Sequence, residues 1–164
     1  MSKQKAVFLD RDGVINNGGL YYTYKIEDFK FNDDLFESLR LLKKHHYTLI
    51  VITNQGGISK GEYSKKDVDE VHQYMIDCLK KEDIEIAEAY YCPHHDSLEQ
   101  CICRKPNNIN IEKAIARFNI DRNQSFLIGD GARDIEAGEK SGLKSFKIEK
   151  NASILDICKT IVQA

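Results

Sequence analysis

The sequence contains no tryptophan, only two prolines and two methionines, and no clear excess of either sign of charge. Lys and Arg number 24 against 26 Asp and Glu, a net charge of −2, whereas nucleic-acid-binding domains usually have a clear excess of basic residues. No apolar run approaches the roughly 18 residues of a membrane-spanning helix. We therefore expect neither a nucleic-acid partner nor a membrane partner.

The chain length and composition favour one folded domain. At 164 residues, 41% of them hydrophobic and 30% charged, the chain can bury a core without a disulfide or a metal for bulk stability. We expect a single domain over residues 1–164 and a monomer. The N-terminal residues show no signal-peptide cleavage pattern, so we also expect a cytoplasmic location.

Short apolar segments alternate along the chain with segments of helical periodicity. Runs rich in β-branched and aromatic residues predict strands at 6–9, 48–53, 87–91, 125–128 and 144–148. Helical periodicity predicts helices around 35–42, 64–79, 111–118, 134–141 and 154–162. Such alternation is typical of an α/β fold: a doubly wound, mostly parallel, Rossmann-like sheet with helices on both faces.

Polar residues follow four of the five predicted strands. Asp10 and Asp12 follow the first, residues 53–57 (TNQGG) the second, a Cys/His cluster with Lys105 the third, and Asp130 the fourth. Ligands of such sheets bind beyond the carboxyl ends of the strands. An Asp-x-Asp-Gly sequence alone is more often an ordinary turn, but four polar strand ends together favour a functional site.

The acidic residues at these strand ends match the chemistry of phosphate transfer. Asp10, Asp12 and Asp130 would form an all-oxygen cluster suited to Mg²⁺. With the metal and Lys105 neutralising a phosphate, one aspartate could attack phosphorus while the other serves as general acid and base. The Thr53 hydroxyl and the neighbouring backbone amides would hold phosphoryl oxygens.

Four motifs together resemble the haloacid dehalogenase-like phosphatases. They are residues 8–16 (FLDRDGVIN), 51–55 (VITNQ), 101–106 (CICRKP) and 128–130 (IGD) with Asp134. The most similar branch is that of the D-glycero-D-manno-heptose 1,7-bisphosphate 7-phosphatases and histidinol-phosphate phosphatases, and the resemblance runs from residue 6 to about residue 148.

The resemblance implies roles for individual residues. It makes Asp10 the nucleophile and Asp12 the general acid and base, with Mg²⁺ held by the Asp10 carboxylate, the Asp12 backbone carbonyl and Asp130. Thr53 and Lys105 would stabilise the phosphoryl group. The expected substrate contacts are Arg11, Gly18, Gly19, Leu20, Tyr21, Asn54, Gln55, Gly56 and Arg104.

The cysteine spacing indicates a structural zinc site. Cys92, His94, Cys101 and Cys103 supply three sulfurs and an imidazole within twelve residues, the ligand set of a closed tetrahedral zinc site. On spacing alone His95 could replace His94, whereas the resemblance favours His94. Zinc would pin the loop that carries Arg104 and Lys105. We expect Cys78 and Cys158 to pack in the core and His45, His46 and His72 to lie at the surface.

The substrate is expected to be a small phosphorylated molecule. Residues 24–31, 56–61 and 90–95 resemble the heptose branch and favour removal of the 7-phosphate of the heptose bisphosphate, although Gly131 stands where heptose enzymes often have Lys. The short spacing between His94 and Cys101 is nearer to the histidinol-phosphate branch. The chain could also act on another small sugar phosphate, or be a phosphotransferase or a non-catalytic zinc-stabilised binding module. No segment is long enough for a separate cap domain, so residues 13–32 and the zinc-pinned loop would provide selectivity.

Overall fold

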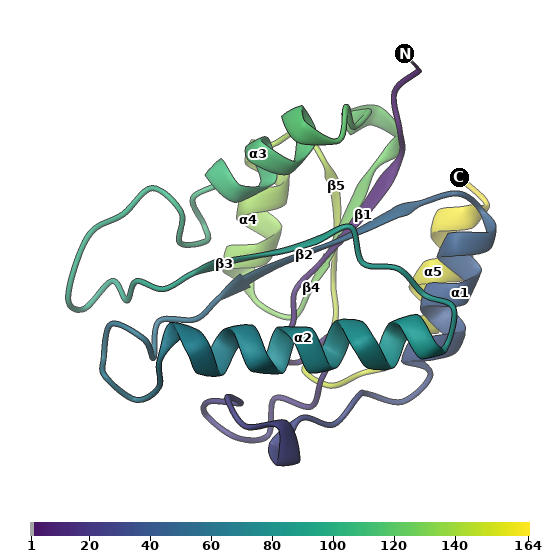
Figure 1. The fold of residues 1–164 in the computed structure, drawn as a ribbon. Helices are drawn as coiled ribbons and strands as arrows, with labels where there is room; N and C mark the ends of the chain where they lie inside the picture. Colours follow the sequence, from purple (N-terminus) through teal and green to yellow (C-terminus); the bar gives the residue numbers. More distant parts are fainter. Residues whose placement is uncertain (1) are drawn as a thin grey trace.

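The computed structural model describes residues 2–164, in which five parallel strands form one sheet in the order β3-β2-β1-β4-β5 (Figure 1). The strands are β1 Ala6–Leu9, β2 Thr48–Asn54, β3 Glu88–Cys92, β4 Phe126–Gly129 and β5 Lys144–Lys147. The helices are α1 Leu35–Lys44, α2 Lys65–Lys81, α3 Ile109–Arg117, α4 Ala132–Lys140 and α5 Leu155–Val162, with 3-10 turns at Ile26–Asp28 and Arg122–Gln124. The predicted doubly wound α/β fold is confirmed.

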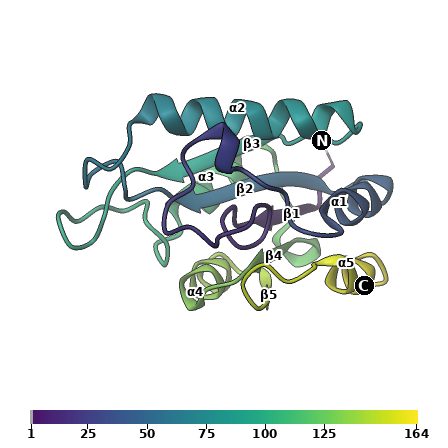
Figure 2. The same cartoon turned by 90° about the horizontal axis from the view of Figure 1, so that it is seen from below.

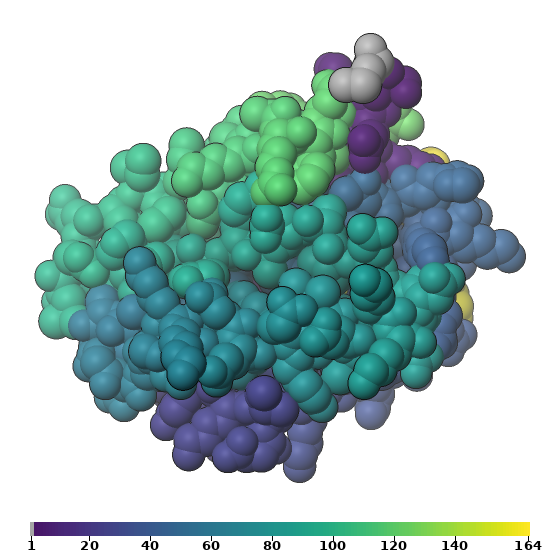
Figure 3. Space-filling model, viewed as in Figure 1, coloured from purple at the N-terminus to yellow at the C-terminus, as the bar shows by residue number. Residues whose placement is uncertain are grey.

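Each face of the sheet is covered by helices, because successive side chains of a strand point to opposite faces. Val7 and Leu9 of β1 pack into one core with apolar residues of α1, α2 and α5. Ala6 and Phe8 pack into a second core with residues of α3 and α4. Figure 2 shows α2 at the β3 side of the sheet and α4 and α5 at the β5 side. In the space-filling view, α2 lies across the lower part of the face turned to the viewer, and the green residues of the α3 region lie above it (Figure 3).

The helix starts agree with local sequence signals. Ser64 and Asp67 form a capping box, in which the Ser64 Oγ accepts a hydrogen bond from the Asp67 amide at 3.2 Å and the Asp67 carboxylate accepts one from the Ser64 amide at 2.7 Å. α4 begins at Ala132, two residues before its predicted start at Asp134. The reason is that the Asp134 carboxylate, in the first turn of the helix, accepts a hydrogen bond from the Gly131 amide and so caps that turn. Cys158 is buried in the core, as expected, whereas Cys78 is only partly buried.

The strand order places the functional edge of the sheet. β1 is central and pairs with β2 on one side and β4 on the other. The chain winds from β1 towards β3 and then from β4 towards β5, so the winding direction reverses between β1 and β4, and ligands of doubly wound sheets bind at this switch point. Among residues 2–164, no separate cap domain covers this edge. No helix in the described part of the chain has the length and apolarity to span a membrane.

Candidate active site

The switch point brings the expected acidic residues together. Asp10 directly follows β1 and Asp130 directly follows β4, the two strands between which the winding direction reverses. The turn after Asp10 passes very close to Asp130, since a Cβ added to Gly13 would lie 2.2 Å from the Asp130 Oδ2. Gly13 also has φ +86°, a backbone conformation that glycine adopts without strain. Only glycine therefore allows these two strand ends to meet.

Asp10 is a buried carboxylate in a crowded environment. Its Oδ1 accepts hydrogen bonds from the Arg11 amide at 2.8 Å and from the Lys105 Nζ at 3.0 Å. Burial raises the pKa of Asp10 well above its ordinary value, and the charge of Lys105 offsets this only in part. The nearby Asp134, Asp12 and Asp130 raise the pKa further. Ionised Asp10 therefore needs a further cation.

Lys105 is almost fully buried and held by three oxygen atoms. Its Nζ lies 3.0 Å from the Asp10 Oδ1, 2.6 Å from the Asp134 Oδ1 and 2.6 Å from the carbonyl oxygen of Ile52. Burial lowers the pKa of Lys105, but the Asp10 and Asp134 carboxylates outweigh burial and raise the pKa above its ordinary value. The ammonium is therefore charged at neutral pH.

The carboxylates at this edge fit a hard divalent cation. One oxygen from each of Asp10, Asp130 and Asp134 lies within 4.8 Å of the others. Both Asp134 oxygens are already engaged, one by Lys105 and the other by the Gly131 amide at 3.0 Å. Asp134 therefore holds the lysine, while Asp10 and Asp130 have oxygens for a metal. Burial raises the pKa of Asp130 as well, and such an oxygen cluster is the kind of site that Mg²⁺ occupies.

Asp12 differs from Asp10 because four hydrogen bonds stabilise its charged form. Its Oδ1 accepts from the Arg11 Nη2 at 2.8 Å, the Arg11 Nε at 3.2 Å and the Asn16 Nδ2 at 3.0 Å, and its Oδ2 accepts from the Gln55 Nε2 at 3.2 Å. Burial raises the pKa of Asp12, but the Arg11 charge and these hydrogen bonds leave it below the ordinary value. Asp12 is therefore ionised at neutral pH and can accept a proton.

Arg11, expected among the substrate contacts, has no surface open to a substrate in this structure, with 0% exposure. Besides Asp12, its guanidinium donates to the Thr23 carbonyl at 2.7 Å and lies 3.2 Å from the His72 Nε2. The expectation that His72 lies at the surface is wrong, because this face of α2 packs on the turn after β1. Burial and the Arg11 charge lower the pKa of His72 to about 3. The neutral imidazole therefore accepts the Arg11 hydrogen bond and positions Asp12 indirectly.

We expect His72→Leu to lower kcat by about ten-fold, because the buried guanidinium loses an acceptor, at a cost of about 1–3 kcal/mol, and Asp12 loses its fixed position. His72→Gln, which offers a carbonyl oxygen, should restore most of the rate. Steady-state kinetics and thermal unfolding of both variants check this. Equal kcat values for His72→Leu and the wild type would contradict the positioning role.

Residues at the end of β2 are partly committed to internal contacts. Asn54 clamps the backbone of Lys105: its Oδ1 accepts from the Lys105 amide at 2.9 Å and its Nδ2 donates to the Lys105 carbonyl at 3.2 Å. Gln55 is buried and bonded to Asp12, to the Thr53 Oγ1 at 2.9 Å and to the Tyr63 hydroxyl at 2.8 Å. The Gln55 side chain therefore orients the site, and neither amide side chain is free for substrate.

A cavity of about 470 Å³ opens beside Asp10. Five of the residues expected at the site line this cavity: Asp10, Asp12, Thr53, Asn54 and Lys105. Residues 131–134 complete the lining. The expected contacts at residues 18–21 do not line this cavity, and Tyr21 is 82% exposed, with the Lys60 Nζ 5.9 Å from its ring centroid.

Arg133 lines the cavity beside Asp10 but was not among the residues expected at the site. The sequence signal that could have indicated it is its place in the first turn of α4, directly after a polar strand end.

The four expected zinc ligands meet in space. The Cys92 Sγ lies 2.9 Å from the Cys103 Sγ and 3.6 Å from the Cys101 Sγ, and the His94 Nδ1 lies 3.2 Å from the Cys103 Sγ. The His95 Nδ1 instead contacts the Ser97 Oγ at 2.7 Å, so His94 is the histidine that completes the set. Three thiol sulfurs and an imidazole nitrogen fit a tetrahedral structural zinc ion.

Comparison with known proteins identifies the relatives of the chain. The family model described as polynucleotide kinase 3 phosphatase matches residues 7–157. The D-glycero-alpha-D-manno-heptose-1,7-bisphosphate 7-phosphatase of Campylobacter jejuni is 46% identical over 136 residues, which cover 83% of this chain and 77% of the relative. The D-glycero-beta-D-manno-heptose-1,7-bisphosphate 7-phosphatase of Helicobacter pylori (strain 26695) is 41% identical. That match covers 88% of this chain and 83% of the relative.

Solved structures show the same fold. A putative HAD-like phosphatase from Mesorhizobium loti has a TM-score of 0.88 at 21% identity, covering 99% of this chain and 88% of that one. The D,D-heptose 1,7-bisphosphate phosphatase of B. bronchiseptica, complexed with magnesium and phosphate, has a TM-score of 0.82 at 20% identity, covering 98% of this chain and 99% of that one. With the sequence matches over most of the chain, these findings show that the chain belongs to the haloacid dehalogenase-like phosphatases and is a phosphoric monoester hydrolase.

Proposed function

We propose that this phosphatase removes the 7-phosphate of D-glycero-D-manno-heptose 1,7-bisphosphate in a reaction that requires Mg²⁺. The observation that carries the chemistry is the meeting of Asp10, Asp130 and the Lys105 ammonium at one point of the sheet edge. The identity of 46% to a relative named for this reaction supports the substrate. A single domain over residues 1–164, a monomer and a cytoplasmic location stay predictions.

Asp10 is the nucleophile of the first step. Its carboxylate oxygen attacks phosphorus, a phosphorus–oxygen bond forms, and the bond from phosphorus to the sugar oxygen breaks. Asp12 takes up a proton when the anionic phosphate enters, because a nearby negative charge raises the pKa of a carboxyl group. Asp12 then donates this proton to the departing sugar oxygen. The products of this step are the sugar alcohol and an acyl phosphate on Asp10.

Water resolves the acyl phosphate in the second step. Asp12, now ionised again and oriented by Arg11, removes a proton from a water molecule as the water oxygen attacks phosphorus. The bond from phosphorus to the Asp10 oxygen breaks, which releases inorganic phosphate and restores the Asp10 carboxylate. Lys105 keeps its charge throughout, because Asp134 continues to hold its ammonium.

The cofactors have separate tasks in this proposal. The Asp10 and Asp130 carboxylates and the Asp12 backbone carbonyl would hold Mg²⁺, which would supply positive charge to neutralise the phosphoryl group. Thr53 and the backbone amides near Gly56 bind phosphoryl oxygens beside it. Cys92, His94, Cys101 and Cys103 would hold a structural zinc that would order the loop leading to Lys105. A structural role follows because the four protein ligands leave no open position.

Phosphate release from a substrate panel tests the proposed function. The panel contains both anomers of D-glycero-D-manno-heptose 1,7-bisphosphate, histidinol phosphate and simple sugar monophosphates, each with and without Mg²⁺. We expect one heptose bisphosphate to have a kcat/KM at least roughly ten-fold above every other compound, with heptose 1-phosphate as the product. A higher kcat/KM for histidinol phosphate would contradict the proposed substrate while leaving the phosphatase chemistry intact.

A further inference from the structure

A series of buried hydrogen bonds joins Tyr63 to the end of β2. Tyr63 is buried and lies in the loop between β2 and α2, directly before the residue that caps α2. Its hydroxyl donates to the Gln55 Oε1 at 2.8 Å, and the Gln55 Nε2 donates to the Thr53 Oγ1 at 2.9 Å. Thr53 in turn lines the cavity beside Asp10. We call Tyr63, Gln55 and Thr53 the Tyr63 network.

The surroundings of Gln55 set the direction of these hydrogen bonds. The Gln55 Nε2 also donates to the Asp12 Oδ2, at 3.2 Å, so the amide turns its nitrogen towards Asp12 and its carbonyl oxygen towards Tyr63. Because a carbonyl oxygen can only accept a hydrogen bond, the Tyr63 hydroxyl must donate. Burial raises the pKa of the Tyr63 hydroxyl, so the proton that makes this bond stays in place at neutral pH.

Thr53 keeps one hydrogen-bond donor for the cavity. Its Oγ1 accepts from Gln55, so its own proton must point elsewhere. The acceptor that residues 2–164 offer is the Asn54 carbonyl oxygen at 3.5 Å, far beyond the usual length of about 2.7–2.8 Å for such a bond. The Thr53 proton is therefore available to an oxygen atom of a molecule bound beside Asp10.

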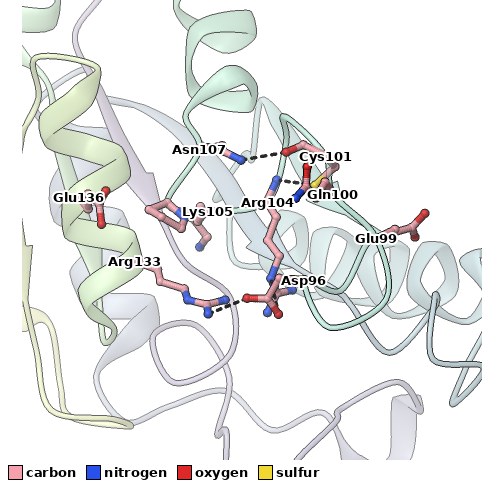
Figure 4. Close-up of a pocket in the computed structure, with 10 residues that line it drawn as sticks. Asp96, Glu99, Gln100, Cys101, Arg104, Lys105, Asn107, Arg133 and Glu136 are labelled. Atoms are coloured by element: carbon pink, nitrogen blue, oxygen red, sulfur yellow. Dashed lines mark hydrogen bonds and ion pairs between the residues drawn. The ribbon is translucent and has the colours of Figure 1, made fainter.

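The Thr53 hydroxyl faces the reacting phosphate and not the rest of a substrate. Lys105 lines two cavities, the one beside Asp10 and a neighbouring one of about 530 Å³, which is drawn in Figure 4. Thr53 lines the first cavity and is not among the residues that line the second. A hydrogen bond from Thr53 therefore acts on the phosphoryl group of any phosphomonoester that this site accepts.

Both partners of the hydrogen bond between Tyr63 and Gln55 are held in place. The Tyr24 ring stacks on the Tyr63 ring with centroids 5.1 Å apart and planes 13° apart. Gly57 lies against the same ring, since a Cβ added to Gly57 would lie 2.1 Å from the Tyr63 Cε1. The Gln55 backbone amide donates to the Cys92 carbonyl at 2.8 Å. The Tyr63 hydroxyl and the Gln55 amide are thus positioned before a substrate binds.

We propose that Tyr63 is a positioning residue of this phosphatase, which acts through Gln55 to fix the Thr53 hydroxyl as a hydrogen-bond donor to the phosphoryl group. The inference rests on the proposed function in one respect, that Thr53 binds a phosphoryl oxygen. Asp12 depends on Gln55 less than Thr53 does, because three further hydrogen bonds hold the Asp12 carboxylate. Without the Tyr63 hydroxyl, the buried Gln55 carbonyl oxygen loses its partner, and the amide no longer holds Thr53 in one orientation.

A double-mutant cycle tests the proposal, with kcat/KM measured on whichever compound of the substrate panel the wild type hydrolyses best. We expect Tyr63→Phe to lower kcat/KM by about five- to ten-fold, as for the weakening of one hydrogen bond in the transition state. Thr53→Val, which removes the hydroxyl and keeps the branched shape, should lower kcat/KM by at least as much. Tyr63→Phe should then have no further effect in Thr53→Val, because the hydroxyl that it orients is gone. In Thr53→Ser, which keeps a hydroxyl, Tyr63→Phe should lower kcat/KM by the same factor as in the wild type.

Tyr47→Phe is the matched control for the loss of a buried tyrosine hydroxyl. Tyr47 is buried, and its hydroxyl donates to the Ile161 carbonyl at 3.3 Å. It lies directly before β2, whereas the Tyr63 network lies at the other end of this strand. Tyr47→Phe should therefore lower the unfolding temperature much as Tyr63→Phe does, but should keep the wild-type kcat/KM.

The possible outcomes separate the Tyr63 network from the proposed function. If Tyr63→Phe lowers kcat/KM equally in the wild type and in Thr53→Val, or leaves the wild-type value unchanged, the positioning role is overturned and the proposed function stands. If Thr53→Val keeps the wild-type kcat/KM, the role of Thr53 in the proposed function is overturned, and the network with it. A substrate other than the heptose bisphosphate overturns the proposed substrate alone, because the cycle is measured on the compound that the enzyme prefers.

Discussion

Asp10→Asn should lower the rate of phosphate release by about a thousand-fold or more, as expected for loss of a nucleophile. The amide that replaces the carboxylate has nearly the same shape but no charge with which to attack phosphorus. The fold should persist, because the Lys105 ammonium keeps its contacts with Asp134 and with the Ile52 carbonyl. Initial rates of phosphate release at saturating Mg²⁺, with circular dichroism of the same samples, measure both parts of this prediction.

The effect of Asp10→Asn on the unfolding temperature can also be predicted. The folded-state pKa of Asp10 is raised, so folding favours its protonated form, and the contribution of Asp10 to stability is lost as the pH rises through that pKa. When no Mg²⁺ is present, the ionised form of the Asp10 carboxyl is destabilised by burial and by repulsion from Asp134 and Asp130. A neutral amide removes this repulsion, and metal-free Asp10→Asn should unfold at or above the wild-type temperature.

A surface aspartate serves as the matched control. Asp156 lies on α5 with its side chain 96% exposed, and Asp156→Asn should retain the wild-type rate. Wild-type turnover by Asp10→Asn would contradict the assignment of the nucleophile. If the Asp10→Asn protein is inactive and also unfolded, the expectation that this variant keeps its fold is contradicted.

Removal of zinc should reduce activity by about a hundred-fold or more without unfolding the sheet. Binding of structural zinc contributes about 10–16 kcal/mol to the folding of zinc-finger peptides. The zinc-ligand loop has few apolar contacts of its own, because Leu98 and Ile102 are both exposed. Without the metal, the loop that ends in Arg104 and Lys105 loses its main restraint, and Asn54 alone holds the backbone of Lys105. Metal analysis, activity and limited proteolysis before and after chelation measure the three consequences.

Cysteine variants separate the metal from the thiols. Cys101→Ser should lose zinc and become sensitive to proteolysis between residues 93 and 108. Cys78→Ser, which alters a cysteine of α2 outside the ligand cluster, should keep about one zinc per chain, as a single four-ligand site requires. A zinc-free wild-type preparation with full activity would refute the structural role of the metal.

Most of the fold could be predicted because the sequence patterns that indicate each helix and strand are local. β1, β2 and β4 are short apolar runs followed by polar residues, and the observed strand boundaries differ from the predicted ones by at most one residue, as with β2, which continues to Asn54. The convergence of Asp10 and Asp130 could be predicted, because parallel strands present their carboxyl ends at one edge. The clustering of Cys92, His94, Cys101 and Cys103 could be predicted because the chemistry and spacing of such a set are specific.

The direction of individual side chains could not be predicted from the sequence. Arg11 stands between two aspartates of the site, yet the turn directs its guanidinium inward to His72 rather than towards a substrate. Gln55 belongs to a motif expected to contact substrate but makes its hydrogen bonds with Asp12, Thr53 and Tyr63. Arg133 reaches the site only because α4 packs beside it. These positions depend on tertiary packing, which no local pattern encodes.

Rapid acid quenching during turnover tests the central claim, that Asp10 forms a covalent acyl phosphate. The wild-type protein is mixed with a substrate that carries a radiolabelled phosphate, quenched within a single turnover, digested and analysed by mass spectrometry. We predict that the label is bound to the peptide that contains Asp10, and that no label is bound in Asp10→Asn. Label on any other residue, or protein free of label while phosphate is still being released in the first turnover, would contradict the claim.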